Sequence, residues 1–311
     1  MTRKIIIDTD PGVDDAMAIL LALRSPEVEV IGLTSVFGNT RTEITAQNAL
    51  RILELEGNGA IPVAQGADRP LVKALGELGG TRVHGEDGLG NTHLPAPRSA
   101  LCSESAAEFI IQSVLANPGE ITLAPLGPLT NLGLALRLEP RIVGLVREVV
   151  LMGGSAFAGG NVSPVAEANI ANDPHAAQMV FSAGWPVTML GLDVTHHTVM
   201  TAQMLADLAN AHNPATDFLT RILPLYQRFH AEVYGMGGAI HTHDPSVIAY
   251  LIDPSLYQTR SMPIFVETEG RCAGQTVPDP RHFWIDGPET QVCLGVDAPR
   301  VLDLICSRLE R

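Results

Sequence analysis

The fold is indicated most clearly by residues 5–15, Ile5-Ile6-Ile7-Asp8-Thr9-Asp10-Pro11-Gly12-Val13-Asp14-Asp15. Three consecutive β-branched aliphatic residues predict a strand buried on both faces, and Pro11-Gly12 predicts a turn. The two carboxylates that follow are typical of the first turn of a helix, where the helix dipole favours negative charge. A buried strand that turns directly into a helix is the opening unit of a parallel α/β sheet. We therefore expect a strand at 4–7 and a helix at 14–23.

The same alternation continues through the first two thirds of the chain. Short apolar segments predict strands at 28–36, 61–64, 121–124, 148–152 and 186–190, and longer amphipathic segments predict helices at 42–55 and 103–115. In the last third, the pattern predicts a helical region at 201–230, strands at 261–267 and 291–296, and a closing helix at 298–309. We expect an α/β fold with a doubly wound, mostly parallel central sheet and flanking helices, in a single domain over residues 1–311.

Composition excludes several classes of function. The 311 residues carry 34 acidic and 20 basic side chains, a net charge of −14 that repels nucleic-acid phosphates and anionic membranes. The sequence contains neither a secretory apolar segment near residue 1 nor an apolar run of about 18 residues. Its four cysteines form no CxxC pair, which is typical of reduced thiols. We expect a cytoplasmic protein that acts on a small molecule.

Four carboxylates surround the first turn of the chain. Asp8 and Asp10 share one face of the strand end, and Asp14 and Asp15 begin the helix. The helix dipole contributes roughly 0.3–1 kcal/mol per charge, too little to offset repulsion between carboxylates held within about 4–6 Å. A cation or a shared proton must therefore stabilise them, and oxygen ligands favour Ca²⁺ or Mg²⁺. Asp244 is a further candidate ligand, although Asp before a helix is equally an N-cap.

Several other polar residues have two interpretations. Asn39 and Asn161 follow glycines and could be ordinary turn residues, and Glu167 and Asn169 could be surface polar residues. The paired His196-His197 is interpreted as loop structure rather than as a metal site.

The sequence resembles the inosine-uridine preferring nucleoside hydrolase family. The resemblance is carried by motifs that occur in family order along the chain: residues 8–15 (DTDPGVDD), 83–90 (VHGEDGLG), 125–131 (PLGPLTN), 150–154 (VLMGG), 167–170 (EANI) and 243–245 (HDP). A short DxD motif alone would be weak, whereas the ordered set is highly specific.

The resemblance implies a role for individual residues and hydrolysis of the N-glycosidic bond of ribonucleosides. Ca²⁺ would be bound by Asp10, Asp15, Asp244 and the main-chain carbonyl of Leu126, and Asp14 would be the general base. The ribose hydroxyls would contact Asn39, Asn161, Glu167 and Asn169, and the nucleobase would lie near His84 and His243. The resemblance also implies a homodimer or homotetramer.

The leaving nucleobase needs a proton, and a histidine can supply it near neutral pH. His243 is the expected donor, and the additional His241 is an alternative to it. Family members often cover the nucleobase with a helix, for which Tyr226, Phe229, His230 and Tyr234 are the candidates here.

Two other classes of function remain open at this point. The strand Ile5-Ile6-Ile7-Asp8-Thr9-Asp10 also resembles the nucleophile strand of haloacid-dehalogenase-type phosphohydrolases, in which Asp8 would attack phosphorus. That family favours Thr or Val two residues after the second Asp, where this chain has Gly12. The second alternative is a non-catalytic, Ca²⁺-dependent ribose-binding protein that would use Asp10, Asp15 and Asp244 without turnover.

Overall fold

The structure is a computed structural model that describes residues 2–76 and 79–311. Within these residues a nine-stranded sheet has the order β10-β9-β11-β6-β5-β4-β1-β2-β3. The strands are β1 Arg3–Thr9, β2 Val28–Ser35, β3 Val63–Gln65, β4 Ile121–Pro125, β5 Glu148–Met152, β6 Val187–Leu190, β9 Tyr257–Val266, β10 Thr276–Pro278 and β11 Glu289–Val296, with β7 Val199–Met200 and β8 Ile240–His241 in a separate pair. Pairing is parallel from β11 to β3 and antiparallel at β9 and β10. The predicted doubly wound, mostly parallel sheet is confirmed.

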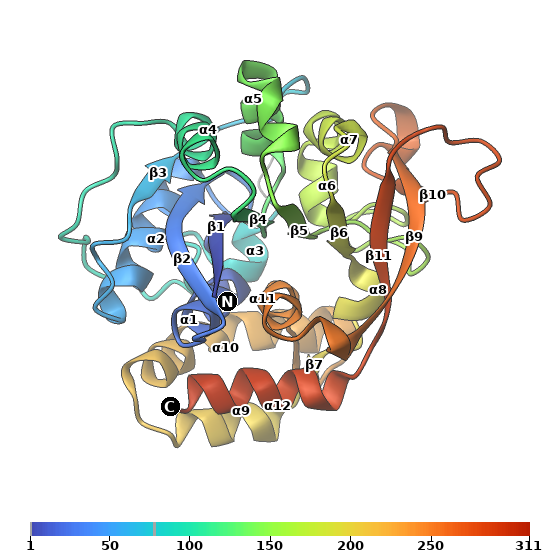
Figure 1. The fold of residues 1–311 in the computed structure, drawn as a ribbon. Coiled ribbons are helices and arrows are strands. Elements are labelled where there is room, and N and C mark those ends of the chain that lie inside the picture. The colour runs from blue at the N-terminus through green and yellow to red at the C-terminus, as the bar shows by residue number, and fades with distance from the viewer. Residues whose placement is uncertain (1, 77–78) are drawn as a thin grey trace.

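Helices cover both faces of this sheet (Figure 1). One face carries α4 Ala106–Ala116, α5 Thr130–Leu138 and α7 Pro174–Ser182, whereas α1 Val13–Leu23, α2 Thr42–Leu55 and α11 Pro245–Ile252 cover the other. A further layer of α9 Ala202–Ala209, α10 Pro214–Tyr234 and α12 Ala298–Leu309 packs below α1 and α11. The remaining helices are α3 Thr81–His84, α6 Ala168–Asn172 and α8 Leu192–Thr195, with 3-10 turns η1 Pro140–Gly144, η2 Pro254–Leu256 and η3 Gly270–Cys272.

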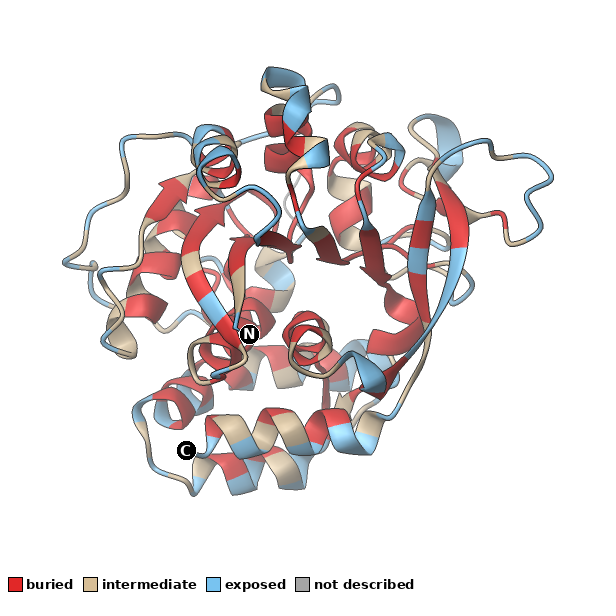
Figure 2. Ribbon diagram, in the orientation of Figure 1, coloured by how far each residue is buried: buried red, intermediate tan, exposed pale blue. Residues whose placement is uncertain are grey.

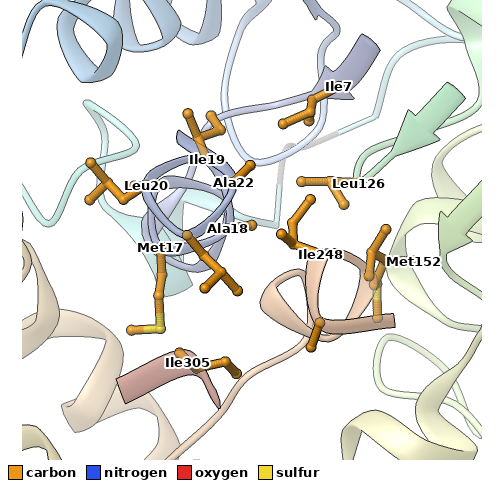
Figure 3. Close-up of a cluster of buried hydrophobic side chains, with 14 of the residues drawn as sticks. Ile7, Met17, Ala18, Ile19, Leu20, Ala22, Leu126, Met152, Ile248 and Ile305 are labelled. Carbon is orange, nitrogen blue, oxygen red and sulfur yellow. The ribbon is translucent and has the colours of Figure 1, made fainter. Parts of the chain in front are cut away.

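The alternating side chains of β1 divide the core in two. Ile5 and Ile7 pack with α1 and α11, and Ile6 packs into the cluster on the opposite face. Figure 3 shows Ile7, Leu126 and Met152 from the strand ends meeting Ile19 and Ile248 of α1 and α11. The central strands are mostly buried, while β9, next to the edge strand β10, exposes several residues (Figure 2). Because this burial locks β1 between two helical layers, it places the β1–α1 turn rigidly.

Several predicted boundaries were wrong. The helical region at 201–230 is two helices, because Asn213 caps a new one at Pro214. The strand predicted at 61–64 begins at Val63, and the one predicted at 261–267 begins at Tyr257.

Among the described residues, no helix combines the length and apolar character needed to cross a membrane.

The order of the strands defines where a site can form. β1 lies between β2 and β4, so the chain winds outward in opposite directions from the β1–β4 boundary. In such sheets ligands bind beyond the carboxyl ends of the strands at this switch point. The backbone N–H of Leu126, just after β4, donates to the carbonyl of Asp8 at 2.7 Å, which joins the two strand ends.

Candidate active site

A cavity of about 580 Å³ lies beyond these strand ends. The residues predicted from the sequence that line it are Asp14, Asn39, His84, Leu126, Asn161, Glu167, Asn169, His243 and Asp244. They come from the first turn of α1, from the loops after β2, β4 and β5, from α3 and α6, and from the segment just before α11. Asp10 and Asp15 are buried beside the cavity rather than in its lining, and His241 lies behind His243. Segments up to 230 residues apart in sequence are thus brought to one place.

Three carboxylates converge at the base of this cavity. Asp14, Asp15 and Asp244 are buried, and one oxygen of each lies within 4.8 Å of the others. Asp244 is the N-cap residue of α11, as one interpretation of the sequence expected, but among the described residues its side chain makes no capping hydrogen bond to that helix. Asp10 faces the loop after β4, because a side chain at Gly127 would lie 2.5 Å from its Oδ1 atom.

The electrostatics of these carboxyl groups are unfavourable without a cation. Burial, and then repulsion by Asp14, Asp15 and Asp10, raises the pKa of Asp244 well above its usual value. Burial and the charge of Asp15 do the same for the pKa of Asp10. Among the residues that the structure describes, one oxygen each of Asp10 and Asp14 is buried without a hydrogen-bond partner. Buried carboxylate oxygens that lack donors are the ligands that a hard divalent cation prefers, so these residues fit a metal ion.

Hydrogen bonds to main-chain groups and to neighbouring carboxylates fix the polar wall of the cavity. Glu167 caps α6 by accepting the N–H groups of Asn169 and Ile170, and it also accepts that of Gly154 at 2.9 Å. The Asn169 amide donates to the carbonyl of Leu126 at 2.6 Å, which leaves that oxygen a second lone pair. Asn39 donates to Asp15 at 2.9 Å. Glu167 is 2% exposed, so its interpretation as a surface residue was wrong.

The opposite wall is aromatic and rich in histidine. Tyr226, Phe229, His230 and Tyr234 line it from α10. His243 is held by a 2.9 Å contact between its Nδ1 atom and the Thr195 hydroxyl, and its ring lies 5.4 Å from that of His241. Burial lowers the pKa of His230 to about 4 and of His241 to about 3. An aromatic wall with a few polar atoms suits a nucleobase.

Three contributors to this site were not found from the sequence. His196, interpreted as loop structure, packs its ring 4.8 Å from His241 and 5.8 Å from His243. Asp193 accepts the N–H groups of Ala156, Phe157 and Ala158 and thereby shapes the loop that leads to Asn161. The functions of His196 and Asp193 could not be predicted from the sequence, because the residues that they contact are distant along the chain.

The third is Asn131, whose amide donates to Asp8 at 2.7 Å and to the carbonyl of Ser35 at 2.9 Å. It also accepts the N–H of Ala67 at 2.9 Å. Asn131 therefore ties three strand ends together below the cavity. Its place in the quoted 125–131 motif was a signal, although its function was not inferred.

Comparison with known proteins agrees with this geometry. Residues 5–303 match the family model described as inosine-uridine preferring nucleoside hydrolase. A probable uridine nucleosidase 2 of Arabidopsis thaliana is 42% identical, over 99% of this chain and 97% of the relative. The inosine-uridine preferring nucleoside hydrolase of Leishmania major is 40% identical, over 100% of this chain and 98% of the relative.

Solved structures show the same similarity. A plant nucleoside hydrolase superposes with a TM-score of 0.96 at 39% identity, covering 99% of both chains. A purine-preferring ribonucleoside hydrolase from Gardnerella vaginalis superposes with a TM-score of 0.94 at 36% identity, covering 99% of this chain and 98% of the other.

Proposed function

The chain belongs to the inosine-uridine preferring nucleoside hydrolase family and is a ribonucleoside hydrolase, an N-glycosidase; from this premise we propose how its cavity performs the reaction. The observation that carries the proposal is the buried group of Asp14, Asp15 and Asp244 beside a wall of amide and carboxylate side chains. A nucleoside fits with its ribose at the carboxylate end and its base against the histidines and aromatic rings.

We assign the cation as Ca²⁺, held by Asp10, Asp15, Asp244 and the carbonyl of Leu126. Ca²⁺ accepts a mixed shell of carboxylates, carbonyls, water and hydroxyls more readily than Mg²⁺ does. When bound, the ion supplies positive charge that orients the ribose hydroxyls and makes a nearby water more acidic. Asn39, Asn161, Glu167 and Asn169 bind the ribose hydroxyls.

Asp14 is the proposed general base. Its Oδ1 atom has no hydrogen-bond partner within residues 2–76 and 79–311 and its side chain lines the cavity, so it can accept a proton from water. Burial raises the pKa of Asp14 to about 6, while a hydrogen bond from Tyr226 opposes that rise. Its negative charge also stabilises the oxocarbenium-like sugar that develops as the bond breaks.

His243 is the proposed proton donor to the departing base. His243 lines the cavity beside the aromatic wall, whereas His241 is outside the cavity lining, with its ring 5.4 Å from that of His243. Burial, and then the neighbouring histidines, lower the pKa of His243 well below its usual value, so only a small fraction of the imidazole is protonated near neutral pH, and that fraction is a strong acid. His241 then packs against the ring of His243, and we propose that it does not contact the substrate.

The phosphohydrolase alternative is not supported by the position of Asp8. This residue is 1% exposed, its Oδ1 atom accepts hydrogen bonds from Thr34 and Asn131, and it does not line the cavity. The binding-protein alternative fails to explain an unpartnered Asp14 oxygen facing the sugar site.

A panel of purine and pyrimidine ribonucleosides, scored for free ribose with and without chelator, tests the proposal. Release of ribose only with the metal supports it, and release of phosphate from phosphate esters alone contradicts it.

We further propose a cytoplasmic homodimer or homotetramer. The location is supported by the four free cysteines, of which Cys272 is exposed. The assembly is supported by the family resemblance. Light scattering on the purified protein tests the assembly, because a monomer at micromolar concentration contradicts it.

A further inference from the structure

The imidazole of His84 is held against the first turn of α1. The backbone N–H of Val13, the first residue of α1, donates to His84 Nδ1 at 3.1 Å. This N–H is one of the groups at a helix start that have no partner within the helix. The ring reaches it because Gly12 has no side chain, since a Cβ there would lie 2.6 Å from His84 Nδ1.

This hydrogen bond determines where the imidazole carries its proton. A backbone N–H can only donate, so Nδ1 must accept and cannot itself bear a hydrogen. Both the imidazolium and the Nδ1–H tautomer are thereby excluded, and the proton lies on Nε2. The positive end of the α1 dipole also disfavours a cationic ring at this position.

The Nε2 side of the His84 ring, which carries the proton, faces the cavity. His84 lines it, with its ring centroid 5.3 Å from that of Tyr226 and its Nδ1 atom 3.8 Å from Asp14 Oδ1. Within residues 2–76 and 79–311, Nε2 has no hydrogen-bond partner. An N–H donor of fixed direction is therefore available to whatever fills the space between Asp14 and the aromatic wall.

We propose that His84 is a locked hydrogen-bond donor, whose Nε2–H binds an acceptor atom of the nucleobase, a ring nitrogen or a carbonyl oxygen. As the glycosidic bond breaks, the bonding electron pair moves onto the base, and a donor fixed in this position stabilises that negative charge without giving up its proton. Proton delivery remains with His243. The identity of the acceptor rests on the proposed function, whereas the tautomer does not.

The tautomer is tested directly by ¹⁵N NMR of histidine-labelled protein at neutral pH, with His84 assigned by its loss in H84Q. The expected spectrum has a proton on Nε2 and none on Nδ1. Val13→Pro removes the locking N–H, and proline suits the first position of a helix after the extended Gly12. Val13→Ala is the matched control, since it shortens the side chain and keeps the N–H. V13P should show a mixed tautomer and at least a tenfold lower kcat/KM than V13A.

Two results would overturn the proposal. One is an Nδ1–H tautomer or an imidazolium in the wild-type protein, a measurement that stands even if V13P does not fold. The other is equal tautomer populations and equal kcat/KM in V13P and V13A.

A second pair of variants tests the donor itself. Gln and Met have similar length, but only Gln offers an N–H. H84Q should keep at least tenfold more kcat/KM than H84M, with equal Ca²⁺ affinity, and equal kcat/KM in the two variants contradicts a donor function. If the wild-type protein released no ribose from any nucleoside, the proposed function would fail, and the NMR result would still decide the tautomer.

Discussion

The hydroxyl of Tyr226 donates a hydrogen bond of 3.0 Å to Asp14 Oδ2. The two residues are separated by 212 positions in the chain, and the bond joins α10 to the start of α1. It leaves Asp14 Oδ1 at the cavity with no hydrogen-bond partner in the described part of the chain. One oxygen of the proposed base is thus held in place while the other is available for water.

This bond predicts a change in the pH profile of Tyr226→Phe. A hydrogen bond to a carboxylate favours the ionised form, so its loss raises the pKa of Asp14 further above about 6. Because the base must be ionised, the acidic limb of kcat/KM should move to higher pH. Profiles at saturating Ca²⁺ test this, with Tyr250→Phe, a residue outside the cavity lining, as the control. A shift to lower pH would contradict the assignment of Asp14.

Asp14→Ala separates the base from the metal ligands. Loss of a general base lowers kcat by about 10²–10⁴. Since Asp10, Asp15, Asp244 and the Leu126 carbonyl remain, Ca²⁺ affinity by calorimetry should change only a few-fold. Turnover equal to that of the wild type would reject Asp14 as the base, and complete loss of Ca²⁺ binding would make it a ligand instead.

His230 predicts a specific dependence of stability on pH. Burial lowers its pKa to about 4 in the folded chain, against about 6.5 when unfolded. Between these values the unfolded state binds a proton that the folded state does not, so stability falls as pH decreases from 6.5 to 4. The loss is at most about 3 kcal/mol for this residue.

Urea unfolding of His230→Phe across this range measures the effect. Relative to the wild type, the variant should gain stability as the pH falls, because it cannot bind the proton. His212→Asn, at a side chain that is 77% exposed, is the control and should follow the wild type. Parallel curves for H230F and wild type would show that the buried imidazole does not have the lowered pKa.

Asn131→Ala tests the tie between the strand ends. It leaves the carbonyl of Ser35 and the N–H of Ala67 without their partner, and unsatisfied buried groups cost about 1–3 kcal/mol each. We expect a loss of at least about 1 kcal/mol in the free energy of unfolding. Asn210→Ala, at an exposed position, should stay within about 0.5 kcal/mol of the wild type. Equal losses in the free energy of unfolding for both variants would show that the hydrogen bonds of Asn131 do not stabilise the strand ends.

The first turn could be predicted from the sequence because its signals are local. Ile5-Ile6-Ile7 is buried in a central strand, and Pro11-Gly12 leads directly into α1, as the alternation of strand and helix indicates. The order of the sheet could not be derived from that alternation, since β11 pairs with β6 across more than 100 residues and β9 and β10 then add to β11 in antiparallel. The break between α9 and α10 was also missed, because Asn213 resembles any polar residue until its side chain is seen to cap the new helix.

The site divides in the same way. The positions of Asp10, Asp14 and Asp15 follow from one short segment, whereas the tautomer of His84 depends on a contact with Val13, 71 positions away. Asp193 and His196 act through partners in other loops, and residue type alone does not reveal such contacts. Local patterns predict the helices, the strands and the acidic turn. The residues that contact and position the site residues can be identified only from the structure.

The central claim is that these buried carboxylates are stable together because they hold a divalent ion that binds a ribose. Anomalous diffraction from crystals grown with Ca²⁺ and a non-hydrolysable nucleoside analogue tests it most directly. The account predicts one ion bound by Asp10, Asp15, Asp244 and the Leu126 carbonyl, with the sugar hydroxyls in its shell. A well-ordered analogue in the cavity with no ion beneath it, and protons shared between the carboxyl groups, would contradict it.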